Sequence, residues 1–213
     1  RGLRYSDGRG VLVGLTQVGD VVGYEVRDGK KIAVPGKLIY RGYDIEDLIR
    51  DTVSHDEFGF EQTAYLLLFG ELPTVQQLQE FKTLLGSRRT LPDNFTEDMI
   101  MKAPSPDIMN KLARSVLASY SYDSHAEDFS VSNILRQCIE LIARFSTFSA
   151  YAYQAKRRYY DGRSMYIHNP VPELSTAENF LRLIRSDKHY TKLEAETLDL
   201  ALILHAEHGG GNN

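Results

Sequence analysis

The residues best suited to chemistry lie near the end of the sequence, where two histidines precede a run of glycine and asparagine. The segment reads His205-Ala-Glu-His208 and continues with three glycines before Asn212. Residues three apart on a helix share a face, so the two imidazoles would point to the same side. Imidazole can donate a hydrogen bond to a carbonyl or carboxylate oxygen, and glycine lets a ligand approach the backbone closely.

Three roles are open for this segment when only its residues are considered. The histidines could be buried and hydrogen-bonded, with Gly209 ending the helix. They could instead bind an anionic substrate, or a metal ion. The metal role is the weakest, because the zinc-protease pattern places its histidines at i and i+4, whereas His205 and His208 stand at i and i+3. No other cluster of cysteine or histidine supplies a third ligand, so we expect no metal site.

The helix that would carry these histidines begins at a capping box formed by Thr191 and Glu194. Apolar residues dominate from Leu193 to His205, and the second half of this stretch is apolar all round. Such a helix is typical of a buried position. The sequence therefore predicts a buried last helix that ends in a polar cluster.

Helical periodicity runs from Asp44 to the end of the chain and predicts roughly eight helices. Gly70 and Gly86 are expected to end two of them. Capping residues indicate where the helices start, and Pro106, directly after the capping residue Ser105, is typical of the first position of a helix. These capping residues are Asp44, Thr74, Ser105, Ser130 and Ser175.

Residues 1–43 differ from the rest because short β-branched runs alternate with glycine and Asp-Gly. Asp28-Gly29 predicts a tight hairpin turn. Strands do not alternate with helices along the chain, which argues against a parallel α/β sheet. We therefore expect a mainly α fold, with a small β-hairpin region in residues 1–43 and a helical domain in residues 44–213.

Composition limits the partners and the compartment. The 213 residues carry a formal net charge of −4, which does not suit sequence-independent nucleic-acid binding. Cys138 is the single cysteine, so the chain cannot form an intramolecular disulfide, and a reducing cytoplasmic location fits best. Its apolar runs are too short for a membrane span. We expect neither a nucleic acid nor a membrane as partner.

Four segments, in chain order, resemble segments of bacterial-type citrate synthases. Residues 36–48 resemble the L-x-Y-R-G-Y-x-I-E-x-L segment, and residues 60–73 resemble the one that follows it. Residues 166–170 resemble a connector, and residues 205–212 resemble the H-x-D/E-H-x-x-x-N segment at the oxaloacetate site. The resemblance covers nearly the whole chain and implies part of that family's large helical domain.

The resemblance also implies a reaction. Citrate synthases are acyltransferases that condense acetyl-CoA with oxaloacetate to give citrate and CoA, at the entry to the tricarboxylic acid cycle. Acetyl-CoA is a substrate, so no cofactor is expected, and the family implies a homodimer. His208 matches the histidine that binds oxaloacetate, Asn212 matches a substrate-contacting asparagine, and His205 would be a supporting group that orients the site.

The chain departs from the family pattern in what it lacks. The histidine that stabilises the enol, the later G-H-x-x-x-R segment and the catalytic aspartate are not found in these 213 residues. The resemblance therefore places the catalytic residues beyond Asn213, with the small domain absent, and implies an N-terminal fragment that is inactive alone. Two alternatives are a 2-methylcitrate synthase that uses propionyl-CoA and a stand-alone helical binding domain without catalysis.

Overall fold

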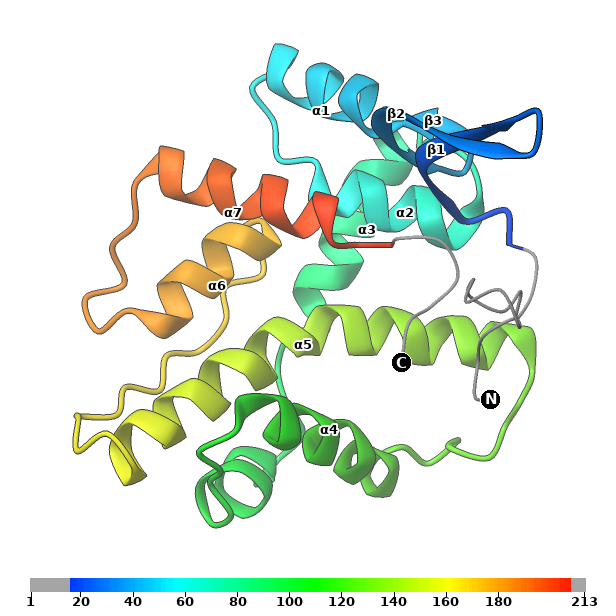
Figure 1. Ribbon diagram of the computed structural model, residues 1–213. Coiled ribbons are helices and arrows are strands. Elements are labelled where there is room, and N and C mark those ends of the chain that lie inside the picture. Colours follow the sequence, from blue (N-terminus) through cyan, green and yellow to red (C-terminus); the bar gives the residue numbers. More distant parts are fainter. Residues whose placement is uncertain (1–15, 208–213) are drawn as a thin grey trace. The chain divides into compact units, whose positions relative to one another are not determined.

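The computed structural model describes residues 16–207, and this part of the chain is mainly helical (Figure 1). It contains seven α-helices, a π-helix, a short 3-10 helix and a three-stranded antiparallel sheet. The expected mainly α fold with a small N-terminal β region is confirmed. Among the described helices, none combines the length and the hydropathy that crossing a membrane requires.

The chain folds into two compact units. Within the described residues, the first unit comprises residues 16–73 and residues 200–207, and the second comprises Thr74–Asp199. Helix α7 (Lys192–Leu204) begins in the second unit and ends in the first. The division into residues 1–43 and 44–213 stays a prediction.

The first unit is built on a β-hairpin. Strand β1 (Gly19–Arg27) pairs antiparallel with β2 (Lys30–Tyr40), and β2 pairs with the short β3 (Tyr43–Asp44). Asp28 and Gly29 have φ angles of 52° and 73°, which a tight two-residue turn between twisted strands requires. The predicted hairpin turn is confirmed.

Two helices and the end of α7 complete the first unit. Asp44 caps α1 (Ile45–Ser54) by accepting a hydrogen bond from the Glu46 amide at 3.0 Å. Helix α2 (Phe60–Phe69) ends at Gly70 in the left-handed conformation, as predicted. Their apolar faces meet in one cluster, whose buried members are Tyr40, Ile45, Leu48, Leu66 and Ile203.

The second unit is organised around the 29-residue helix α5 (Val131–Tyr159). It packs against α3 (Val75–Ser87), α4 (Ile108–Ser119) and α6 (Thr176–Ile184). The π-helix η1 (Thr96–Met101) and the 3-10 helix η2 (Tyr120–Tyr122) flank α4 along the chain. The core of this unit includes Phe95, Ile100, Leu112, Phe148, Tyr151 and Leu183.

Most predicted helix starts are confirmed, and one is wrong. Thr74, Ser175 and Thr191 each form the predicted capping box. The start at Ser105 and Pro106 is two residues too early, because Asp107 caps α4 by accepting from the Asn110 amide at 3.2 Å. The Ser105 hydroxyl instead accepts from the Asp107 amide, in the turn before the helix.

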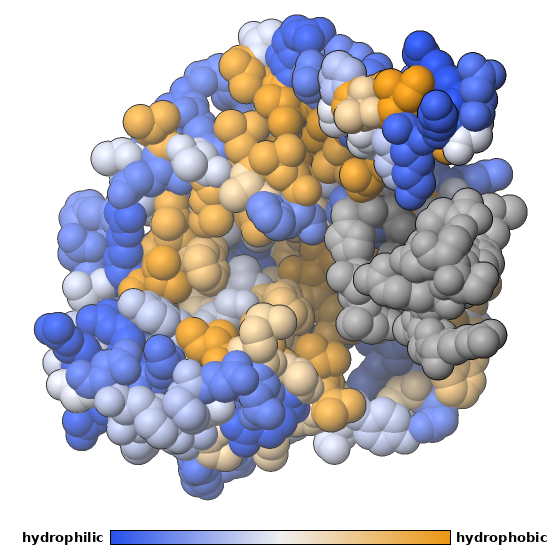
Figure 2. Space-filling view, in the orientation of Figure 1, coloured by the Kyte–Doolittle hydropathy of each residue, from blue (hydrophilic) through white to orange (hydrophobic). Residues whose placement is uncertain are grey.

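The prediction that the last helix is buried all round is wrong for α7 as described. Only one stripe is buried, formed by Ala195, Asp199 and Ile203 at intervals of four residues. Leu193 and Leu204 are 71% and 46% exposed. The described residues therefore cover one face of a helix whose second half is mostly apolar. Figure 2 shows apolar side chains at the surface in the region of α7.

Candidate functional site

The candidate site from the sequence lies at the C-terminal end of α7. His208 and Asn212 lie outside the described residues, so their proposed roles stay predictions. His205 is described and directly follows the helix. The site can therefore be built from the helix end, His205, and the residues that hold this end in place.

His205 is anchored to its own helix. Its Nδ1 lies 2.7 Å from the carbonyl oxygen of Ala201, and the side chain is exposed. Nδ1 must carry a proton to donate this hydrogen bond, so the neutral ring keeps an acceptor at Nε2. The contact orients the ring. The supporting role of His205 stays a prediction.

Tyr40, which belongs to the same buried cluster as Ile203, contacts the end of α7. Its side chain is fully buried, and its hydroxyl donates to the Ile203 carbonyl oxygen at 2.8 Å. The same hydroxyl oxygen accepts from the Glu207 amide at 3.3 Å. Burial raises the pKa of Tyr40, so the hydroxyl keeps the proton that it donates.

The turn after Tyr40 is tied to α2 by hydrogen bonds. Arg41 and Gly42 both have left-handed φ angles, 49° and 90°, and reverse the chain between β2 and β3. The Arg41 guanidinium donates to the Leu67 carbonyl oxygen from Nη2 at 2.8 Å and from Nε at 3.3 Å. Arg41 thus satisfies a carbonyl in the last turn of α2.

Tyr40 lies in residues 36–48, a segment that resembles citrate synthases, but its contacts with the end of α7 were not predicted. Tyr40 and Ile203 are 163 positions apart, and no local pattern links a strand end to a helix end at that separation. The only indication in the sequence was general: a buried tyrosine usually finds a hydrogen-bond partner for its hydroxyl. Among the described residues, no group of three or more His, Cys, Asp or Glu side chains could hold a metal ion.

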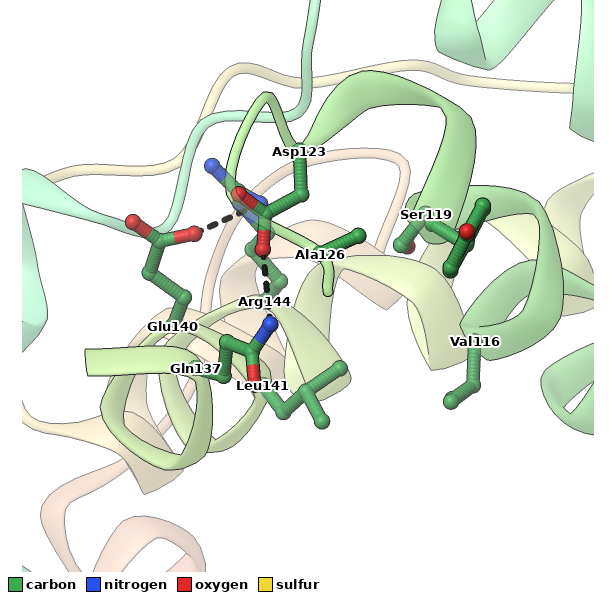
Figure 3. Close-up of a pocket in the computed structure, with 9 residues that line it drawn as sticks. Val116, Ser119, Asp123, Ala126, Gln137, Glu140, Leu141 and Arg144 are labelled. Carbon is green, nitrogen blue, oxygen red and sulfur yellow. Dashed lines mark hydrogen bonds and ion pairs between the residues drawn. The ribbon is translucent and has the colours of Figure 1, made fainter. Parts of the chain in front are cut away.

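A second candidate is a pocket of about 170 Å³ in the second unit (Figure 3). It lies among α4, η2, the following loop and α5, and its apolar wall includes Val116 and Leu141. Its polar wall is occupied by internal contacts. Gln137 Nε2 donates to Asp123 at 2.9 Å, and Arg144 lies 3.2 Å from Glu140.

Arg136 joins the two carboxylates of this pocket wall. Its Nη2 lies 2.7 Å from Asp123 Oδ2, and its Nη1 lies 3.1 Å from Glu140 Oε1. Hydrogen bonds from Gln137 and Arg136 lower the pKa of Asp123 to about 2. The charged groups therefore stabilise one another, and we interpret the pocket wall as a structural ion-pair cluster.

Acid is expected to weaken this cluster. The carboxylate of Asp123 is favoured in the folded state, so its contribution is complete above about pH 4 and is lost as the pH falls through 2. We expect Asp123→Asn to cost about 1–2 kcal/mol at pH 6 and much less near pH 2. Urea unfolding at both pH values measures this difference.

The exposed Asp93 offers a matched control for Asp123. We expect Asp93→Asn to change the free energy of unfolding by less than about 0.5 kcal/mol at either pH. An equal loss for Asp123→Asn at pH 6 and near pH 2 would contradict the assigned role of its charge.

A family model described as citrate synthase, C-terminal domain, matches residues 3–213. The citrate synthase of Haloferax volcanii is 33% identical over 178 residues, which cover 82% of this chain and 44% of that protein. The 2-methylcitrate synthase of Shewanella oneidensis is 32% identical over 174 residues, which cover 80% of this chain and 42% of that protein. The chain thus spans less than half the length of these curated relatives.

Solved structures of citrate synthases share the fold of this chain. The citrate synthase of Pyrobaculum aerophilum superimposes with a TM-score of 0.75 at 26% identity, over 97% of this chain and 49% of that one. The citrate synthase of Thermoplasma acidophilum shares the fold, with a TM-score of 0.71 at 23% identity, over 90% of this chain and 44% of that one. Because the family model matches almost every residue, the chain belongs to the citrate synthase family.

Proposed function

We propose that this chain serves a citrate synthase reaction, in which acetyl-CoA and oxaloacetate condense and water hydrolyses the thioester to give citrate and CoA. The observation that carries the proposal is the match of the citrate synthase model to residues 3–213. A relative with the same fold, from Thermoplasma acidophilum, was solved as a ternary complex with carboxymethyl coenzyme A and oxaloacetate. The substrates of this chain are inferred from that likeness.

In this proposal the end of α7 provides one side of the oxaloacetate site. His208 and Asn212 donate hydrogen bonds to oxaloacetate, and His205 supports them. The ketone oxygen of oxaloacetate gains negative charge as the carbon–carbon bond forms, so donors fixed at a helix end stabilise the transition state. His205 is held by its Nδ1 contact with Ala201, which supports a fixed geometry.

The remaining chemistry is assigned to residues outside this chain. Removal of a methyl proton from acetyl-CoA needs a base, and the enol needs a donor. The family resemblance places the aspartate and histidine for these steps after Asn213. Activity therefore requires more than residues 1–213, and the homodimer, the cytoplasmic location and the role in the tricarboxylic acid cycle remain part of the proposal.

His208→Ala tests the substrate site in a full-length protein that contains residues 1–213. We expect the affinity for oxaloacetate to fall about 10- to 100-fold, because a hydrogen bond to a charged ligand is lost. Isothermal titration measures this affinity. His189→Ala is the matched control, since His189 is exposed in the connection between α6 and α7. Unchanged affinity in His208→Ala would exclude His208 from the site.

A second candidate function is 2-methylcitrate synthase, with propionyl-CoA as the acyl donor. The relative from Shewanella oneidensis supports it, because this 2-methylcitrate synthase is 32% identical to the chain, and the citrate synthase of Haloferax volcanii is 33% identical. Acetyl-CoA and propionyl-CoA differ by one methylene. An acyl pocket that distinguishes them changes the ratio of their kcat/KM values by about 10- to 200-fold. Comparing kcat/KM for acetyl-CoA and propionyl-CoA in the full-length enzyme decides between them.

A further inference from the structure

Helix α7 ends in an unusual hydrogen-bond arrangement. The His205 amide donates to the Ala201 carbonyl oxygen at 3.2 Å, as in a regular α-helix, and the Ala206 amide then donates to Ile203 at 3.2 Å. The next regular bond would join the Glu207 amide to the Ile203 carbonyl, four residues back. Both of these groups bond the Tyr40 hydroxyl instead.

The Tyr40 hydroxyl thus stands between a helical donor and its acceptor. It gives its proton to Ile203 and accepts the proton of Glu207, which satisfies both groups while keeping them apart. A side chain that enters the helical hydrogen-bond ladder changes the direction of the chain. Here the contact of the Tyr40 hydroxyl coincides with the end of α7 at Leu204.

The position of this hydroxyl is set by elements other than α7. Tyr40 is the last residue of β2, pairs with Tyr43 across the sheet, and is fully buried. The following residue, Arg41, is tied to α2 through the Leu67 carbonyl oxygen. The sheet and α2 therefore fix the hydroxyl, and the hydroxyl fixes where α7 ends.

We propose that Tyr40 is a positioning residue for oxaloacetate: its hydroxyl ends α7 between Ile203 and Glu207 and so directs the chain that leads into His208. This inference rests on the proposed function. His208 follows Glu207 by one peptide bond, and each residue of an α-helix turns the chain by about 100°. Continuing the helix past Glu207 would therefore change the direction in which the chain leaves Glu207.

Tyr40→Phe tests this role, because phenylalanine keeps the ring in the core and removes only the hydroxyl. In the full-length enzyme we expect the KM for oxaloacetate to rise about tenfold, and the KM for the acyl-CoA to change less than twofold. We also expect the Glu207 amide to exchange its hydrogen with solvent faster than in the wild type, because it loses its acceptor.

Tyr151→Phe is the matched control. Tyr151 is also buried, and its hydroxyl donates to the His168 carbonyl oxygen at 2.9 Å in the second unit. This variant loses a similar hydrogen bond, so it controls for general destabilisation. We expect its KM for oxaloacetate to equal that of the wild type.

The possible results separate this inference from the proposed function. Weak oxaloacetate binding in Tyr40→Phe and His208→Ala, with normal binding in Tyr151→Phe, supports the positioning role. If only His208→Ala binds weakly, the proposed function stands and the positioning role is overturned. An equal rise in KM for both tyrosine variants also overturns it. If the wild type does not bind oxaloacetate, the proposed function fails and this inference fails with it.

Discussion

Gly86→Ala is expected to destabilise the second unit strongly, by about 3 kcal/mol or more. A Cβ atom at this position would lie 2.2 Å from the Pro172 carbonyl oxygen and 3.0 Å from its carbonyl carbon. These are backbone atoms, so relief requires the end of α3 or the segment before α6 to move. The prediction that Gly86 ends its helix is wrong, because α3 continues to Ser87 and is capped by Arg88. The tight approach explains why a glycine stands in the last turn of this helix, where it is otherwise unfavourable.

The sign of this effect distinguishes two physical causes. Helix propensity alone predicts that alanine stabilises α3 by about 1 kcal/mol relative to glycine. Steric overlap with Pro172 predicts the opposite, and at a distance of 2.2 Å the overlap outweighs the gain in propensity. Urea unfolding of the variant measures the net result.

Gly36→Ala serves as the control for Gly86. A Cβ at Gly36 would meet no atom within 4 Å. We expect its free energy of unfolding to stay within about 1 kcal/mol of the wild type. A Gly86→Ala protein as stable as the wild type would show that α3 and the segment at Pro172 do not approach so closely.

Arg89→Met is expected to cost about 3–5 kcal/mol, because it leaves two carbonyl oxygens without their charged donor. Arg89 is only 2% exposed, and its Nη1 donates to the Val171 and Leu174 carbonyl oxygens at 2.8 and 2.6 Å. The Arg89 carbonyl oxygen accepts from Thr147 on α5 at 3.0 Å. One residue therefore joins the end of α3 to α5 and to the segment before α6.

The neighbouring Arg88 provides the matched control. Its side chain is 49% exposed and lies 3.8 Å from Glu140. We expect Arg88→Met to cost less than about 1 kcal/mol, as is usual for an exposed ion pair. Urea unfolding of both variants under the same conditions measures the contrast, and equal losses would refute the structural role of Arg89.

Gly86 and Arg89 act on the same segment, so their effects should not add. Both contact the stretch from Val171 to Leu174, one by close packing and the other by hydrogen bonds. Once either residue is replaced, the stretch is already displaced and the second replacement costs less. A double variant is therefore expected to lose less stability than the two single variants together.

Features that depend on near neighbours in the chain were predictable. The Asp28-Gly29 turn needs only two residues that accept positive φ, and both adopt it. Each confirmed capping box joins residues three positions apart, as Ser175 and Glu178 do. The start of α4 was misplaced because Ser105 and Asp107 both suit a cap, and the choice between them depends on how the chain enters the helix.

Features that depend on distant partners were not predictable. Lys111 is 2% exposed and donates to the Met99 and Ala103 carbonyl oxygens at the end of the π-helix, although lysine normally indicates a surface. Periodicity predicted a wholly buried α7, but burial requires packing partners on every face, and the described residues supply them on one. The roles of His208 and Asn212 stay predictions.

The mainly α class, the hairpin, most helix starts and the family could be predicted from the residues alone, because they follow from local hydrogen bonds and from short motifs. That buried Arg89 and Lys111 satisfy carbonyl groups, and that Tyr40 bonds the end of α7, became evident only in the folded chain. The physical reason is that a buried polar group must find a partner, whereas the identity of that partner depends on which distant segment folding brings within hydrogen-bond distance.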